Sequence, residues 1–289
     1  MSNFVVPEFQ AFFDYDVQLK VYKNGSVSVK RYSDKLKRKK SGYVLLHDSD
    51  DSDNSINSGI CLEKQKFKKN DSVGEILKRN LVRSRNLLID YASENEKDFK
   101  SFITLTFREN LQDINIANRE FNKYISKVKR VFPDFMYLGV PEFQKRGAVH
   151  YHLVTNLVPG SVLLPLQNGE KNKYDVKYWL LGFSSVFNLN MADDNFNVAL
   201  YMCKYMFKDF DNRLYGRHKI LHSNNLSKPN VFYLQRNSAV YINAMEYIKK
   251  KGYSITEYTF VPDESFQIPF DVVNCKVSDI EEFDSLLNI

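Results

Sequence analysis

Residues 135–156 read FMYLGVPEFQKRGAVHYHLVTN, and this stretch indicates how the middle of the chain folds. Apolar residues dominate on both sides of Lys145-Arg146-Gly147, which has the composition of a three-residue hairpin loop with glycine where a positive φ is needed. The stretch therefore predicts two antiparallel strands. Such a loop places Glu142 directly across from His150, whereas a slip of one residue would send Glu142 to the other face.

The second of these strands carries two histidines separated by one residue. In a strand, side chains at i and i+2 share a face, so His150 and His152 point the same way. With Glu142 opposite, two imidazoles and a carboxylate converge, which is a ligand set for a divalent cation. An isolated His-x-His pair is more often structural, but the chain holds only 5 histidines and a carboxylate lies at the matching position. We therefore expect a metal site.

Residues 195–208, NFNVALYMCKYMFK, predict a helix with two different faces. Tyr201, Lys204, Tyr205 and Lys208 follow the i, i+3, i+4, i+7 spacing of one face, and the apolar residues occupy the other. An ordinary amphipathic helix with half-exposed tyrosines would show the same pattern. The alternative is chemical, because a cation one turn away stabilises a phenolate whose ordinary pKa is about 10.

The rest of the chain predicts short strands that alternate with helices. Helices are expected at 72–95, 115–131, around 178–179 and at 240–250, and strands at 101–107 and 183–189. Alternating apolar residues around Asn24-Gly25 predict a further hairpin. Together these elements indicate an α+β protein with a central, mostly antiparallel sheet and flanking helices.

Three successive segments are expected. Residues 1–70 hold the first hairpin, a basic run at 35–40 and an acidic, serine-rich stretch at 48–58 that reads as a loop or disordered segment. The basic run has two interpretations, a solvated face or a binding site. Residues 71–235 contain the histidine and tyrosine motifs, and residues 236–289 form a C-terminal extension.

The overall composition narrows the class of protein. The formal charge of +6 is modest and favours polyanion binding only slightly. Three widely spaced cysteines form neither a disulfide framework nor a Cys-x-x-Cys pair, so a reducing, cytoplasmic location is expected. The sequence has no apolar run long enough to cross a membrane and no secretory signal pattern. It also lacks a P-loop motif, so we expect no helicase activity from this chain.

Three motifs in order resemble the HUH superfamily of replication initiators and relaxases, named for histidines flanking a bulky apolar residue. FITLTF at 102–107 is similar to the first motif, GAVHYHLV at 147–154 to the metal motif, and YMCKYMFK at 201–208 to the nucleophile motif. The resemblance covers roughly residues 72–230 and is greatest to the Rep proteins of small plasmids or single-stranded DNA phages. It implies the HUH endonuclease fold, with an RRM-like or ferredoxin-like core.

The resemblance also implies an activity, the nicking and rejoining of single-stranded origin DNA to initiate rolling-circle replication. Mg²⁺ or Mn²⁺ would be held by the residues named above, His150, His152 and Glu142. Tyr201 or Tyr205 would form a 5′-phosphotyrosine, and the Tyr-x-x-x-Tyr-x-x-Lys arrangement favours two competent tyrosines. The residues that support these ligands and phenols would be Lys204 and Lys208 at the phosphate and Lys145 and Arg146 along the DNA.

Partners expected on this basis are origin DNA, a host helicase and a polymerase. Two other interpretations stay open. A relaxase or transposase would use the same chemistry in mobilisation. A nucleic-acid-binding protein without catalysis would use the same basic and aromatic surfaces, with the histidines as packing residues.

Overall fold

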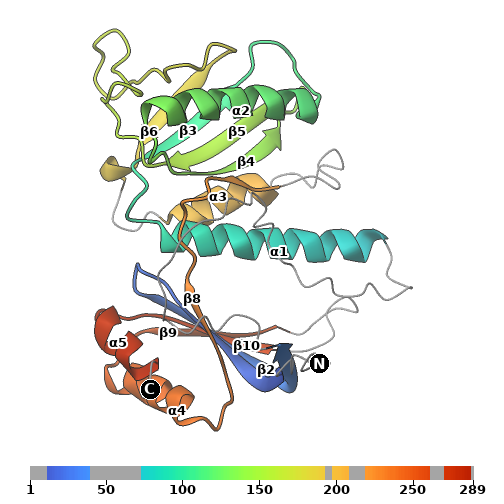
Figure 1. The fold of residues 1–289 in the computed structure, drawn as a ribbon, viewed down its shortest axis with the longest axis vertical. Coiled ribbons are helices and arrows are strands. Elements are labelled where there is room, and N and C mark those ends of the chain that lie inside the picture. Colours follow the sequence, from blue (N-terminus) through green and yellow to red (C-terminus); the bar gives the residue numbers. More distant parts are fainter. Residues whose placement is uncertain (1–11, 40–72, 193–196, 208–218, 261–269, 288–289) are drawn as a thin grey trace, which may run out of the picture. The chain divides into compact units, whose positions relative to one another are not determined.

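The computed structural model describes residues 12–39, 73–192, 197–207, 219–260 and 270–287 (Figure 1). These residues form two antiparallel five-stranded sheets and five α-helices, which confirms the predicted α+β class. The chain divides into two compact units. The terminal unit takes its described residues from the ranges up to Lys20, from Val27 to Ile76 and from Val231 onward, and the central unit comprises Val21–Ser26 and Leu77–Asn230.

The terminal unit is built from both ends of the chain. Its sheet has the strand order β8-β1-β2-β10-β9, with two helices, α4 and α5. The bounds are β1 Phe12–Val21, β2 Ser26–Lys39, β8 Asn230–Leu234, α4 Ala239–Lys250, β9 Ile255–Phe260, β10 Phe270–Lys276 and α5 Ile280–Leu287. The hairpin predicted at Asn24-Gly25 is confirmed, because β1 and β2 flank it.

The central unit contains the second sheet, with the strand order β6-β3-β5-β4-β7. Its bounds are α1 Val73–Glu94, β3 Ser101–Thr106, α2 Ile114–Val131, β4 Tyr137–Phe143, β5 Val149–Thr155, β6 Ser184–Asn188, a 3-10 turn Leu189–Met191, α3 Val198–Phe207 and β7 Leu221–His222. Figure 1 shows α2 on one side of this sheet and α3 with α1 on the other. The unit is thus a three-layered arrangement of helix, sheet and helices.

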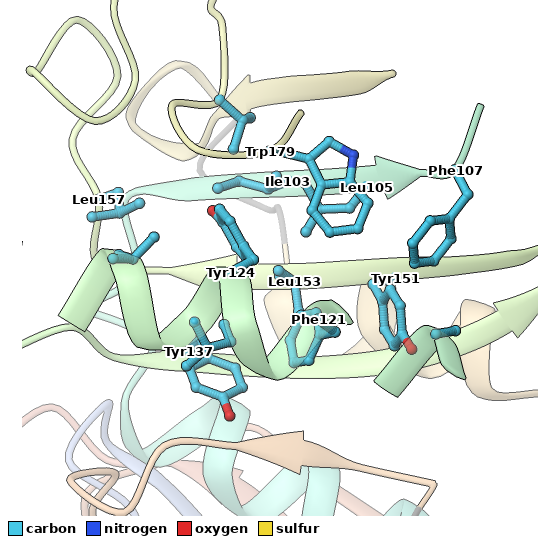
Figure 2. Packing of buried hydrophobic residues seen from close by; sticks show 14 of the residues in the cluster. Ile103, Leu105, Phe107, Phe121, Tyr124, Tyr137, Tyr151, Leu153, Leu157 and Trp179 are labelled. Carbon is cyan, nitrogen blue, oxygen red and sulfur yellow. The ribbon is translucent and has the colours of Figure 1, made fainter. Parts of the chain in front are cut away.

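The face under α2 is closed by aromatic and aliphatic side chains (Figure 2). Alternate residues of β3 and β5 point to this face, and Phe121 of α2 stacks on Tyr151 of β5 at 4.5 Å between ring centroids. Asp113 starts α2, because its carboxylate accepts a hydrogen bond from the backbone N–H of Asn115 at 2.7 Å. This layer gives β5 a rigid support from below.

The opposite face is covered by α1 and α3. Leu88 and Ala92 of α1 and Met202 of α3 are buried there with residues of three strands, Phe102, Leu138, Val140 and Val154. The strand β5 is buried along its whole length, because helices cover both of its faces.

The expected hairpin register is confirmed. Glu142 pairs with His150, and the backbone N–H of Gln144 donates to the carbonyl of Ala148 at 2.8 Å. Gly147 closes the loop with φ +90°, the conformation for which glycine was expected.

The short helix expected around 178–179 is wrong. These residues form a turn in which Tyr178 has φ +73°, and the Trp179 indole is buried, donating to the carbonyl of Thr106 at 3.2 Å. Tertiary burial of one large ring decided this segment rather than its helical propensity. The stretch at 48–58 lies outside the described residues, and the division into three successive domains stays a prediction.

Candidate active site

The three candidate metal ligands lie on the sheet face that α1 and α3 cover. His152 pairs with Thr104 of β3 and Val140 of β4, while His150 pairs with Thr106 and Glu142. Both histidines alternate with residues that pack under α2, so their rings emerge on the opposite side. The sheet therefore presents Glu142, His150 and His152 together.

His152 is held by two contacts. Its Nε2 lies 2.6 Å from Oε2 of Glu142, and its Nδ1 lies 3.2 Å from the hydroxyl of Thr104. The residue is 6% exposed, so both contacts are shielded from water. His150 is also buried, and its ring centroid is 6.3 Å from that of His152. Thus Glu142 faces His150 in the register but contacts His152 diagonally across the strands.

The donor set suits a divalent cation, although it is not arranged around one point. Within the ranges that the structure describes, no three His, Cys, Asp or Glu side chains are already grouped as metal ligands. Imidazole and carboxylate ligands each bind such ions at about 2.1 Å, so the Glu142–His152 hydrogen bond must open for an ion to enter. The residues fit an ion by chemistry and by placement, after a rearrangement of side chains.

Tyr201 of α3 lies on the same side of the sheet as the histidines. Its ring packs edge-on against Phe102 of β3, with 4.8 Å between centroids. Phe102 in turn stacks on His152, at 5.8 Å and 14° between planes. One phenylalanine therefore connects the tyrosine helix to the histidine strand, and Tyr201 is half-buried beside it.

The remaining predicted residues of this helix are placed to different extents. Lys204 is exposed on α3. The backbone of Tyr205 belongs to α3, but its side chain lies outside what the structure describes, as does the whole of Lys208. The roles expected for these two residues stay predictions.

Three contributors to this face were not singled out as site residues. Phe102 and Thr104 touch His152, and the alternation of FITLTF could have placed both on its face. Arg85 of α1 bonds to Cys203 of α3, whose burial raises the thiol pKa while the guanidinium opposes that rise. Because these two residues are more than 100 positions apart, no local pattern could have paired them.

Lys145 and Arg146 form the exposed tip of the β4–β5 hairpin. The Arg146 side chain donates from Nε to Gln144 at 2.8 Å and from Nη2 to the carbonyl of Phe107 at 3.3 Å. These bonds orient the guanidinium at the end of the hairpin, while Lys145 extends into solvent.

The central unit carries the positive charge of the chain. Its sequence has 24 Lys and Arg against 15 Asp and Glu, whereas the terminal unit has 17 against 20. The unit with the histidine face is therefore the one suited to a polyanion. None of the helices in the described ranges combines the length and apolar composition of a membrane span.

Residues 100–210 match the model of a family of replication-associated proteins, those of the ORF2 type. The matched range includes β3 to β6 and α3, and so it contains the histidine strand, Glu142 and Tyr201. The match supports a role as a replication initiator and, with it, an interaction with DNA. No curated protein and no solved structure matches the chain.

Proposed function

We propose that this chain nicks and rejoins single-stranded DNA at a replication origin, as the initiator of rolling-circle replication of a plasmid or phage. The observation that carries the proposal is the packing of α3 on the histidine face, with Phe102 in contact with both Tyr201 and His152. A phenol and a set of metal ligands on opposite faces could not serve one phosphate.

The reaction is a transesterification that needs no other co-substrate. The Tyr201 oxygen forms a bond to phosphorus, the bond from phosphorus to the 3′ oxygen breaks, and the phenol proton ends on that oxygen. The products are a free 3′-hydroxyl, which a polymerase can extend, and a 5′-phosphotyrosine. Tyr205 would be the second nucleophile, and Lys204 and Lys208 would stabilise phenolate and phosphate charge.

Glu142, His150 and His152 would hold Mg²⁺ or Mn²⁺. When bound, such an ion polarises the scissile phosphate and neutralises its developing charge. For His152 to be a ligand through Nε2, its proton must reside on Nδ1, where the Thr104 hydroxyl can accept it. The 3.2 Å contact with Thr104 would thus orient the ring in either protonation state.

Strand separation would depend on supercoiling or a host helicase, because the chain lacks a P-loop motif. The DNA would have to reach the sheet unpaired, with Lys145 and Arg146 at the hairpin tip close to its phosphates.

The test is a search for a covalent adduct. Overlapping single-stranded oligonucleotides covering the DNA around the coding gene, labelled at the 3′ end, are incubated with the protein and Mn²⁺ and run on denaturing gels. We expect one of them to yield a labelled protein band that EDTA prevents. Tyr201→Phe combined with Tyr205→Phe should abolish the band, and Tyr174→Phe should leave it unchanged.

Two further variants separate the roles on the sheet. His152→Ala should abolish the adduct, and Thr104→Val should slow its formation by about 10-fold, the usual effect of losing a partner that orients a ligand. Retention of the adduct in the double tyrosine variant would show that another residue is the nucleophile. DNA binding without an adduct in the unaltered protein would favour the non-catalytic alternative.

A further inference from the structure

Two phenylalanines at the edge of the central unit's sheet are exposed, which is unusual for large apolar rings. Phe183 immediately precedes β6 and is 72% exposed, and Phe187 within β6 is 46% exposed. In the described strand order, β6 is the outermost strand on its side. These rings contribute little to the core, so their exposure calls for another explanation.

Both rings belong to the face that carries the candidate active site. Phe187 pairs with Phe102, the residue that contacts His152 and Tyr201. Phe183 continues the ladder, because the N–H of Thr106 donates to its carbonyl at 2.8 Å. Since side chains alternate along a strand, Phe183 and Phe187 share one face.

The pairing places Phe183 in the same cross-strand row as the metal ligands. That row runs from Phe183 through Thr106 and His150 to Glu142. Neighbouring strands are about 4.8 Å apart, so Phe183 and His150 stand roughly 10 Å from each other across β3. This separation is on the scale of one nucleotide and its neighbour.

Cations border this edge. Arg108 is exposed just beyond β3, where its backbone N–H donates to Leu181 at 2.9 Å. At the same end of β3, the guanidinium of Arg146 reaches the carbonyl of Phe107. Flat apolar rings beside fixed positive charges match an occupant that has planar apolar groups on an anionic backbone.

We propose that Phe183 and Phe187 form a stacking platform for the bases of unpaired DNA next to the scissile phosphate. The inference rests on the proposed function and names how this face would hold its substrate. Stacking on aromatic rings accommodates every base, because every base has a π-face. Four strand residues separate the rings by about 13 Å, too far to hold one base between them, so each ring takes a different base.

The experiment measures binding without cleavage. Fluorescence anisotropy in EDTA compares a labelled oligothymidylate with an abasic oligonucleotide of equal length, using the full chain. Phe183→Leu and Phe187→Leu keep an apolar side chain but remove the ring. Each should weaken oligothymidylate binding about 5-fold or more and leave abasic binding unchanged. Phe183→Trp should retain the affinity, and Leu166→Ala, which removes another exposed apolar side chain, should have no effect.

The outcomes distinguish this inference from the proposed function. If the leucine variants bind as tightly as the unaltered protein while the adduct still forms, the platform is wrong and the nicking activity stands. If the unaltered protein binds no single-stranded DNA, both are wrong. Conversion of a dimer to a monomer by these variants, measured by light scattering without DNA, would identify the face as a contact between two copies and overturn the platform.

Discussion

Two buried tyrosines in the layer under α2 differ at a single atom. The hydroxyl of Tyr151 donates to Oδ1 of Asn118 at 2.7 Å. The hydroxyl of Tyr124 is buried without a hydrogen-bond partner among the described residues. Burial raises the pKa of both phenols, so both are neutral in the folded protein at ordinary pH. The two side chains lie in one cluster, as Figure 2 shows.

Removal of each hydroxyl should therefore have a different effect on stability. Tyr151→Phe loses a hydrogen bond and leaves Asn118 without it, so the free energy of unfolding should fall by about 1 kcal/mol. Tyr124→Phe removes a polar atom that is buried without compensation, so it should be neutral or stabilising. Urea denaturation at neutral pH measures both. An equal loss in the two variants would mean that Tyr124 has a partner.

At the scale of elements, the β4–β5 hairpin sets the geometry of the candidate site. Gly147 has φ +90°, and a Cβ added there would lie 2.9 Å from the side chain of Gln112. Gly169 also has a positive φ, +73°, but a Cβ there would meet nothing within 4 Å. The two glycines share the conformational requirement and differ in their distance from the site.

We predict that Gly147→Ala and Gly169→Ala each lower the free energy of unfolding by about 1–2 kcal/mol, the cost of a left-handed conformation for alanine. Only Gly147→Ala should also slow adduct formation, because its loop sets the register that brings Glu142 opposite His150. Urea denaturation and the gel assay give the two measurements. A slower reaction in the Gly169 variant as well would assign the effect to stability alone.

At the scale of the whole molecule, buried tyrosines couple folding to alkaline pH. Burial raises the pKa of Tyr137 to about 12, and burial together with Asp90 raises the pKa of Tyr22 further. An unfolded tyrosine ionises near pH 10, by its ordinary pKa of about 10. Because the folded pKa is the higher one, the stabilisation is complete below about pH 10 and is lost as the pH rises towards about 12.

The urea midpoint should therefore be level below about pH 10 and fall steeply above it. Tyrosinate absorbance should appear together with unfolding rather than before it, for the buried fraction of the phenols. Circular dichroism and ultraviolet absorbance on the same samples give the comparison. A midpoint that does not change between about pH 10 and about pH 12 would contradict the burial of these rings.

Much of the candidate site could be predicted from local pattern. Alternation placed His150 and His152 on one face, and the chemistry of a three-residue loop placed Glu142 across from His150, as the structure confirms. The helix at 73–94 was predicted to within a residue at each end. The roles of Tyr205 and Lys208 remain predictions.

Local pattern is sufficient in these cases because it reports interactions between residues that are close in sequence, namely the turn and the alternation. It cannot report which helix covers which face of a strand such as β5, whose residues are buried on both sides. The packing of α3 on the histidine face, the Glu142–His152 contact and the exposure of Phe183 were decided by tertiary structure. So was the sheet that joins β1 to β8, more than 200 positions away, because long-range pairing leaves no periodic signal in either strand.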